Sequence, residues 1–461
     1  MKKLIIFYLI LIIAFFALEI ILSNLFKDCS LENTQFASIK EYYLDIHSKF
    51  FVKIIKNNEE VYTPQRAMAD AAKTFLANKP SDVIRIFIVG GSVALQFNND
   101  FEDQLKQFIP NKNIELINCA VGGYDSFRTY LVEKEILNYD PDLIIVFSGN
   151  NEFYDRNGFN VNAYHLARFL NKSFILRTLH KYLKNILNYE NKGFIRDYQT
   201  RLFDYQKNIR KIICASRKRK VPILFATLPF NMRDLAPKVY SDEHSKQLLL
   251  GTYLLWHDDY ENALNEFNKE KDKRDPLLFF YLGETYYGLK QFEKAKECYL
   301  KSNELAARSD WTNATFASNN IIRKVSLEEG VPYVDLEKLF INASPEGIIG
   351  MELLFDNCHW WDDIQPYVNK TIICNILKDK DRLLPHFVFN DYKINQRQPI
   401  EIKYSFEERR DNKEIVNDQS LNSVFFALYE PINSHRPEYL FKNLYFLDPS
   451  RLSEIKFIRE K

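Results

Sequence analysis

Four mostly apolar runs, each about as long as a buried strand, are spaced along the chain with helix-sized segments between them. They cover residues 85–89, 114–117, 143–147 and 222–226, and a further run follows at 330–336. A strand that is apolar on both faces is typical of a parallel sheet covered by helices on each side. The sequence therefore predicts an α/β fold, a three-layer α/β/α sandwich with a parallel sheet.

A helical stretch that repeats itself interrupts this pattern between residues 248 and 305. Small and aromatic residues recur 32 positions later, with Gly251, Tyr260, Ala263 and Phe267 matched by Gly283, Phe292, Ala295 and Tyr299. Small residues let paired helices approach each other, and the aromatic side chains fill the space between them. Residues 241–308 thus resemble a tetratricopeptide-type repeat, which we expect as an insertion between two halves of the α/β domain, 81–240 and 309–380.

The N-terminal region contains an apolar run at 4–22 that only Glu19 breaks. As a helix this run would extend about 28 Å, the thickness of a hydrocarbon core. A cleaved signal peptide would have a shorter apolar region followed by small residues, and neither is present. Lys2 and Lys3 precede the run, so the positive-inside rule places the N-terminus in the cytoplasm. We therefore expect a transmembrane anchor at 1–28 in a single-pass membrane protein whose remainder is periplasmic or extracellular.

Two further segments have no clear period. Residues 29–80 are polar and aromatic, and we interpret them as a membrane-proximal lead-in. Residues 381–461 are charged and aromatic and form a C-terminal extension of unknown role.

Charge and cysteine content exclude several function classes. The 62 Lys and Arg residues balance 61 Asp and Glu residues, a formal net charge of +1, so the basic face that nucleic-acid binding needs is not expected. The six cysteines include no C-x-x-C pair, and none lies at zinc-ligand spacing from another cysteine or a histidine. The chain also lacks the glycine patterns of a dinucleotide site or a P-loop. We expect mostly free thiols, no metal and no cofactor.

Polar turns follow the predicted strands where parallel strands end together. Ser92 comes directly after the first strand, in Val-Gly-Gly-Ser-Val, and the next two strands end in Asn-Cys-Ala-Val-Gly-Gly at 118–123 and Ser-Gly-Asn-Asn-Glu at 148–152. Open α/β sheets bind ligands at this carboxyl edge. Among the eight histidines, only His359 has a carboxylate three residues before it, Asp356, close enough for a turn to bring the two together.

These four blocks, in this order, resemble the SGNH hydrolases, also called GDSL-type esterases, over roughly residues 81–235 and 306–380. The resemblance implies a flavodoxin-like sheet and a serine hydrolase. It makes Ser92 the nucleophile, with His359 and Asp356 as the imidazole–carboxylate pair that acts as its general base. The Ser92 N–H, the Gly123 N–H and the Asn151 side-chain amide would form the oxyanion hole.

The chemistry needs these residue types whatever the family. A serine hydroxyl is a poor nucleophile without a base in reach, and a neutral imidazole held by a carboxylate can serve as that base. Attack on an ester carbonyl places negative charge on oxygen, which preorganised donors stabilise.

The sequence departs from the family pattern at several positions near the site. Gly91 stands where the family has Asp, Ala120 where Gly is common and Glu152 where Asp is common, while Trp360 follows the histidine where Pro is frequent. None of these removes a proton-transfer or oxyanion group, but they bear on the shape of the substrate.

Three residues near the predicted sheet edge are candidate substrate-binding residues. Asn231 and Arg233 follow the fourth strand, and Arg233 could grip an anionic or hydroxylated substrate, with a salt bridge as the alternative. Trp360 could stack on a sugar or line an acyl pocket, with a place in the core as the alternative.

The sequence thus predicts a membrane-anchored SGNH-type esterase that removes an O-acyl group from a cell-surface glycan or lipid through an acyl-enzyme. One alternative is an O-acyltransferase that passes the acyl group to a sugar hydroxyl. Another is a catalytically idle envelope protein whose helical repeat binds a protein partner.

Overall fold

The computed structural model describes the chain at residues 15, 18, 48–66, 71–97, 99–154, 197–237, 245–271, 273–308, 313–389 and 400–403. The predicted anchor at 4–22 lies outside this part except for Phe15 and Leu18, and no helix among the described residues is long and apolar enough to cross a membrane. The chain divides into two compact units, Met1–Ser48 with Asp155–Arg201 and Lys49–Tyr154 with Leu202–Lys461. The second unit contains the elements described below.

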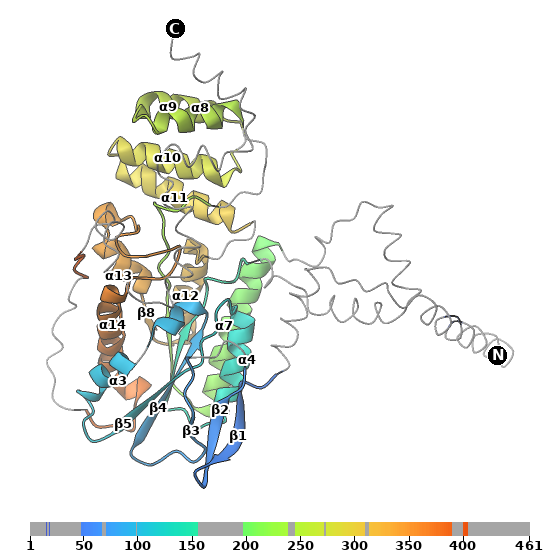
Figure 1. The fold of residues 1–461 in the computed structure, drawn as a ribbon, viewed down its shortest axis with the longest axis vertical. Helices are drawn as coiled ribbons and strands as arrows, with labels where there is room; N and C mark the ends of the chain where they lie inside the picture. The colour runs from blue at the N-terminus through green and yellow to red at the C-terminus, as the bar shows by residue number, and fades with distance from the viewer. Residues whose placement is uncertain are drawn as a thin grey trace. The chain divides into compact units, whose positions relative to one another are not determined.

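A five-stranded parallel sheet forms the centre of this unit (Figure 1). Its order is β5-β4-β6-β7-β8, and the strands are β4 (Val83–Gly90), β5 (Asn113–Asn118), β6 (Leu143–Phe147), β7 (Ile223–Ala226) and β8 (Tyr333–Val334). The five apolar runs are therefore confirmed as strands. Counted along the chain, the order is 2-1-3-4-5, that of a flavodoxin-like doubly wound sheet.

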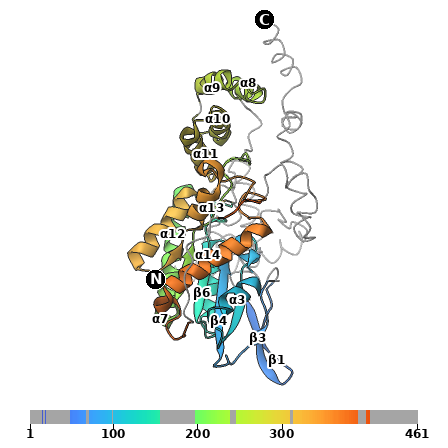
Figure 2. The same cartoon turned by 90° about the vertical axis from the view of Figure 1, so that its left-hand side faces the viewer.

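Both faces of the sheet are buried against helices, which makes three layers. Alternate residues of β4 point to opposite sides, Ile86 and Ile88 into one apolar cluster and Phe87 and Val89 into the other. One face is covered by α3 (Asn99–Lys106), α13 (Leu336–Ala343) and α14 (Gln365–Lys378), and the other by α4 (Ser126–Ile136), α7 (Tyr198–Arg219) and α12 (Phe316–Glu329). Figure 2 shows α14 crossing in front of the sheet. The predicted sandwich is confirmed.

Helix α12 is capped at both ends. Thr315 caps its first turn in a reciprocal pair of hydrogen bonds with Ser318, and Gly330 ends it with a φ of 62°. The strand that follows contains only Tyr333 and Val334 because Asp335 already caps α13.

Two helical hairpins occupy the predicted insertion. They consist of α8 (Lys246–Leu255), α9 (Tyr260–Lys269), α10 (Pro276–Gly288) and α11 (Phe292–Ala306). A Cβ built on Gly251 would lie 2.5 Å from the Phe267 ring, and one on Gly283 would lie 2.6 Å from the Tyr299 ring. The 32-residue repeat therefore corresponds to one glycine–aromatic contact in each hairpin. Whether the hairpins belong to the tetratricopeptide class stays a prediction.

A small antiparallel sheet lies within the segment that the sequence left without regular structure. It contains β1 (Phe51–Lys56), β2 (Glu59–Pro64) and β3 (Phe75–Leu76). Asn57 and Asn58, with φ of 50° and 65°, form the tight turn between β1 and β2. Five of the six residues of β1 are exposed, so the alternation that marks a half-buried strand is missing from the sequence.

One buried arginine joins this small sheet to the central one. The Arg85 side chain is fully buried, pairs with Glu115 at 2.5 Å and donates to the carbonyl oxygens of Leu76 and Tyr139. Its guanidinium also lies over the Phe75 ring, 4.7 Å from the centroid. Of the C-terminal extension, the structure describes only the segment up to 389, with the short helix α15 (Lys380–Leu383), and residues 400–403.

Candidate active site

The sheet topology determines where the site lies. In a 2-1-3-4-5 sheet the chain leaves in opposite directions from the two strands at the switch point, here β4 and β6, and this opens a crevice at their carboxyl ends. Ser92 follows β4, and Asn151 follows β6, the strand that pairs with β4 in the sheet. The parallel register therefore brings these two turns, far apart along the chain, to one edge.

Ser92 opens a short 3-10 helix, η1 (Ser92–Gln96), immediately after the strand turn. Its side chain is half-buried, in contrast to Val93 and Ala94, which are fully buried. The N–H at the first position of a helix has no acceptor within the helix, so the Ser92 N–H makes no hydrogen bond inside η1.

Asn151 packs directly on the residue before the serine. Its side-chain nitrogen donates to the Tyr124 carbonyl oxygen at 3.1 Å, and Asn151 is almost completely buried. A Cβ built on Gly91 would come within 2.4 Å of this nitrogen, so only glycine leaves room for the amide. The absence of a side chain at position 91 is thus what allows the Asn151 amide to reach the serine turn.

The turn after β5 supplies the third side of the site. Gly123 has a φ of 77°, which favours glycine, and its carbonyl oxygen accepts a hydrogen bond from the Arg128 guanidinium. Asn118 fastens this turn to η1, since its amide nitrogen donates to the carbonyl oxygens of Ala94 at 2.7 Å and Phe97 at 3.0 Å. The turns that hold Gly123 and Ser92 are therefore fixed to each other.

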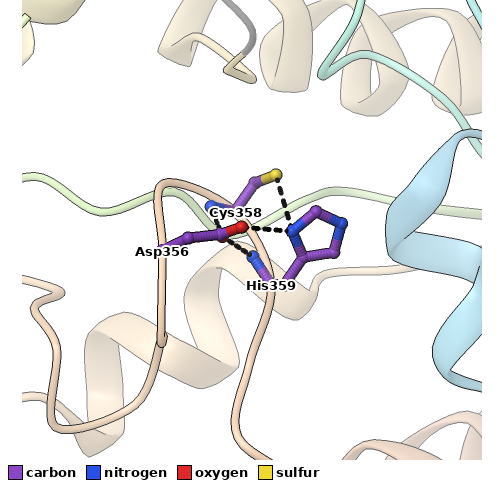
Figure 3. A group of neighbouring side chains, drawn as sticks. All are labelled: Asp356, Cys358 and His359. Atoms are coloured by element: carbon purple, nitrogen blue, oxygen red, sulfur yellow. Dashed lines mark hydrogen bonds and ion pairs between the residues drawn. The ribbon is translucent and has the colours of Figure 1, made fainter. Parts of the chain in front are cut away.

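Asp356 and His359 form the predicted carboxylate–imidazole pair (Figure 3). The distance between Asp356 Oδ2 and His359 Nδ1 is 2.7 Å. The other carboxylate oxygen accepts from the backbone N–H groups of Cys358, at 2.8 Å, and His359, at 2.7 Å. Figure 3 shows the second ring nitrogen pointing away from the carboxylate. The Asp356 side chain can thus hold the proton on Nδ1 and leave Nε2 as the acceptor.

The electrostatics of the pair favour its charged form. Burial alone would lower the pKa of His359, but the Asp356 carboxylate and the Cys358 thiol outweigh it, and the pKa is raised well above its usual value. The pKa of Asp356 is lowered, because the nearby imidazolium and the hydrogen bonds it accepts outweigh the effect of burial. Both shifts favour the imidazolium–carboxylate form of the pair over the neutral form.

The loop of His359 lies close to the serine turn. Asn150 lies between them, with its side-chain nitrogen 3.8 Å from Cys358 Sγ and its oxygen 3.2 Å from a Cβ built on Gly91. Within the described part of the chain the Ser92 hydroxyl and the His359 ring are not hydrogen-bonded to each other. Catalytic hydrogen bonds often tighten only when substrate binds. The Asn150 side chain thus lies close to both loops.

Gln96, which the sequence did not single out, makes a second connection. Its side-chain nitrogen donates to the Trp360 carbonyl oxygen at 2.7 Å, across 264 residues of sequence. A lone glutamine at the end of an expected turn gives no signal of such a contact.

Trp360 lies in the core and has no exposed surface. Its indole N–H donates to Gln365 at 2.6 Å, and its ring packs edge-on against Phe97 and at a tilt against Phe340. Its surroundings therefore match a place in the core, and not the alternative of stacking on a sugar or lining an acyl pocket.

Asn231 lies behind the catalytic loop. Its backbone N–H donates to the Asn357 carbonyl oxygen at 2.9 Å, and its side-chain nitrogen donates to the Asp356 carbonyl oxygen at 3.4 Å. Its side-chain oxygen accepts from the Asp234 N–H. With its groups used in this way, Asn231 supports the loop of the acid–base pair.

Arg233 is enclosed in an ion-pair cluster. It pairs with Asp234 at 2.9 Å and Glu352 at 2.7 Å, and it donates to the Tyr287 hydroxyl of α10 at 3.0 Å. Its guanidinium also lies over the Tyr287 ring. This environment matches the salt bridge that was the alternative to substrate binding. The ion pairs are mostly buried, and Arg233 also contacts α10 of the helical hairpins.

Glu152 fastens the turn of Asn151 to the start of α4. It accepts from the Ser126 backbone N–H at 2.8 Å and the Ser126 hydroxyl at 2.9 Å, and Ser148 lies 3.3 Å from it. Burial and the nearby Asp125 carboxylate raise the pKa of Glu152 to about 8, against the opposing effect of these hydrogen bonds. The sequence noted Glu152 only as a departure from the family pattern.

Among the described cysteines no disulfide forms. Cys119, Cys214, Cys298, Cys358 and Cys374 are all free thiols, as the sequence predicts. Cys29 lies outside the described residues.

Comparison with known proteins finds similarity among solved structures. No protein-family model matches the chain, and no curated protein matches it. The acetyl xylan esterase AlAXEase is 14% identical to this chain, with a TM-score of 0.31. The match covers 63% of this chain and 98% of the esterase. A putative acylhydrolase from Bacteroides fragilis is 10% identical, with 64% of this chain covering 86% of it and a TM-score of 0.32. A GDSL-like lipase from Bacteroides thetaiotaomicron is 10% identical, with 64% of this chain covering 88% of it and a TM-score of 0.30. The proposal that follows depends on the side-chain geometry.

Proposed function

We propose that this protein is a serine esterase of the SGNH type that works through an acyl-enzyme. The observation that carries the proposal is the 2.7 Å contact between Asp356 and His359, on a loop that the Gln96–Trp360 hydrogen bond joins to the helical turn that begins at Ser92. A serine, an imidazole and a carboxylate at one sheet edge have the roles of a hydrolytic triad.

In the first half of the reaction, Ser92 Oγ attacks the ester carbonyl carbon while His359 Nε2 takes the hydroxyl proton. The imidazolium then returns this proton to the departing alcohol, the ester C–O bond breaks, and the acyl group remains on Ser92. In the second half, water attacks the acyl carbonyl, gives a proton to Nε2, and the acid leaves as Ser92 regains its proton. Asp356 keeps the ring oriented and stabilises its positive charge in both halves.

Three donors would stabilise the oxyanion that forms in each half. They are the N–H groups of Ser92 and Gly123 and the amide of Asn151. The proposal is supported by the glycine at position 91, which lets this amide reach the serine turn, and by the bonds that fasten the three turns to one another.

The substrate we propose is an O-acyl ester on a cell-surface glycan or lipid. The apolar run at 4–22 supports this, since an anchored enzyme with a cytoplasmic N-terminus would present its site on the periplasmic or extracellular side. The helical hairpins would be the surface that meets a protein partner.

The test is hydrolysis of a small activated acetyl ester by the full chain. Wild type should turn over, and Ser92→Ala should lower kcat by about 10⁴-fold or more. Analysis of products with and without an acetyl-accepting glycan separates hydrolysis from acyl transfer, because only a transferase gives acetylated glycan. Equal background rates for wild type and Ser92→Ala would instead support the idle interaction protein and contradict the proposal.

A further inference from the structure

Three unlike donor groups lie together on the loop of the proposed acid–base pair (Figure 3). A carboxylate oxygen of Asp356, the sulfur of Cys358 and a ring nitrogen of His359 all lie within 4.8 Å of one another. The shortest distances are 2.7 Å from Asp356 Oδ2 to His359 Nδ1 and 3.6 Å from Cys358 Sγ to the same nitrogen. Asp356 and Cys358 are buried, while the His359 side chain retains 20% of its exposed area, which gives an ion a side from which to enter.

The set contains the ligands that zinc prefers. Zinc binds thiolate sulfur at ~2.3 Å and imidazole nitrogen or carboxylate oxygen at ~2.0–2.2 Å, so a tetrahedral site separates sulfur from nitrogen by roughly 3.6 Å. The observed separation of Cys358 Sγ and His359 Nδ1 is 3.6 Å. The carboxylate oxygen must withdraw, because a tetrahedral site needs roughly 3.3 Å between oxygen and nitrogen. Two of the three donors are therefore already at the spacing of a zinc site.

We propose that Asp356, Cys358 and His359 form an inhibitory binding site for Zn²⁺, with water as the fourth ligand. Binding releases two protons to solvent, the thiol proton of Cys358 and the Nδ1 proton of the His359 imidazolium, which keeps its proton on Nε2. This site could not be predicted from sequence, because a cysteine and a histidine in adjacent positions do not have the spacing of known zinc motifs.

The inhibition follows from the two nitrogens of one ring, and this part rests on the proposed function. In the active arrangement Nδ1 donates its proton to Asp356 and Nε2 is free to accept one. Once a metal takes the lone pair of Nδ1, the neutral ring carries its proton on Nε2. His359 then cannot accept the proton of Ser92, and the Asp356 carboxylate no longer orients the ring.

Metal binding can be measured without any enzyme assay. The full chain is titrated with Co²⁺, which binds zinc sites and gives a near-ultraviolet thiolate-to-cobalt absorption band, and Zn²⁺ is then added to displace it. We expect one equivalent with this band, and Cys358→Ser should lose the band and weaken Zn²⁺ binding by at least ~100-fold, more than the loss of a residue that only supports a ligand. Cys214→Ser is the matched control, because Cys214 is an exposed free thiol and the first place for adventitious metal.

Ester hydrolysis is then measured in the same titrations. Zn²⁺ should inhibit wild type and Cys214→Ser over the range in which it displaces Co²⁺, while Cys358→Ser should stay active and resist inhibition. Absence of the thiolate band in wild type, or its loss in Cys214→Ser instead of Cys358→Ser, would overturn the site. Full activity with the site saturated would overturn the inhibition. If no variant hydrolyses ester under any condition, the proposed function fails, and the cobalt band alone still decides whether the metal site exists.

Discussion

At the scale of single residues, the protonation of His359 controls the proposed chemistry. The ring must be neutral to accept a proton, but Asp356 stabilises its cation strongly enough to raise its pKa well above the usual value despite burial. Activity therefore has to be gained as pH rises, when the imidazolium loses its proton.

The pH profile of kcat/KM tests this balance. In wild type we expect kcat/KM to rise with a midpoint clearly above pH ~6.5, the usual pKa of histidine. Asp356→Asn removes the carboxylate charge, so the midpoint should move to lower pH while the plateau falls by about 10⁴-fold because the ring loses its orientation. An unchanged midpoint in Asp356→Asn would contradict the assignment of Asp356 as the cause of the raised pKa.

Asn151→Ala tests the oxyanion site. Loss of one preorganised donor should lower kcat by about 10²–10³-fold, equivalent to about 2.7–4 kcal/mol of barrier, with little change in KM. Asn138→Ala, a substitution of an exposed asparagine, is the control and should leave kcat unchanged. A decrease in kcat of less than tenfold in Asn151→Ala would remove Asn151 from the oxyanion hole.

Gly91→Ala tests the close contact on which the Asn151 amide depends. The added methyl group would meet the amide nitrogen at 2.4 Å, so the amide must move away from the serine turn. We expect kcat to fall by about 10–100-fold, measured by steady-state kinetics, with part of the donor lost. In an Asn151→Ala background the same change should lower kcat little further, and full additivity would show that the two residues act independently.

At the scale of elements, the helical hairpins depend on glycine facing an aromatic ring. Gly283→Ala would place a methyl group 2.6 Å from the Tyr299 ring, and an overpacked contact of this kind costs about 1–3 kcal/mol of unfolding free energy. Chemical denaturation measures the change, and Asn262→Ala on the exposed side of α9 should cost less than about 0.5 kcal/mol. Equal stability of the two variants would show that the contact does not constrain the helices.

The elements differ in how far the sequence could reveal them. The strands β4 and β6 are buried on both faces, so they are continuous apolar runs and were predicted within a few residues. The strand β1 has only Phe51 buried, and its four apolar residues do not alternate with polar ones, so the pattern of a half-buried strand is missing. The Asn57–Asn58 turn was its one visible signal, because two asparagines with positive φ are typical of a tight hairpin.

At the scale of the whole molecule, the Arg233 cluster joins the helical hairpins to the segment behind the catalytic loop. Arg233 contacts Tyr287 of α10 and pairs with Glu352, while its neighbour Asp234 accepts from the Met351 N–H at 2.6 Å. The three charged side chains are 6–16% exposed, so removal of the cation leaves two carboxylates largely buried.

Arg233→Ala should therefore destabilise the protein by roughly 3–5 kcal/mol, the typical cost of breaking a buried pair from one side. Arg210→Ala is the matched control, since Arg210 pairs with Glu328 and Glu329 but is 38% exposed, and its loss should cost less than about 1 kcal/mol. Unfolding in denaturant measures the loss of unfolding free energy in the two variants. A similar loss in both would contradict the prediction that the Arg233 cluster stabilises the contact between the hairpins and the loop.

The site as a whole could be predicted only where residue type and order carry the chemistry. Ser92 and the Asp356–His359 pair stood out because a serine after a buried strand and a carboxylate three residues before a histidine are local patterns. Gln96, Asn150 and the buried surroundings of Trp360 were not visible, since their roles come from contacts across more than 200 residues of sequence. Such contacts exist only once the sheet has brought the loops together.

Labelling with a fluorophosphonate probe tests the central claim most directly, because the probe bonds only to a serine whose hydroxyl is activated by a base. The account predicts rapid labelling of the folded full chain at Ser92, located by peptide mass spectrometry, and loss of labelling in both Ser92→Ala and His359→Ala. Labelling that persists at the same rate in His359→Ala, or that never occurs at Ser92 in the wild type, would contradict it.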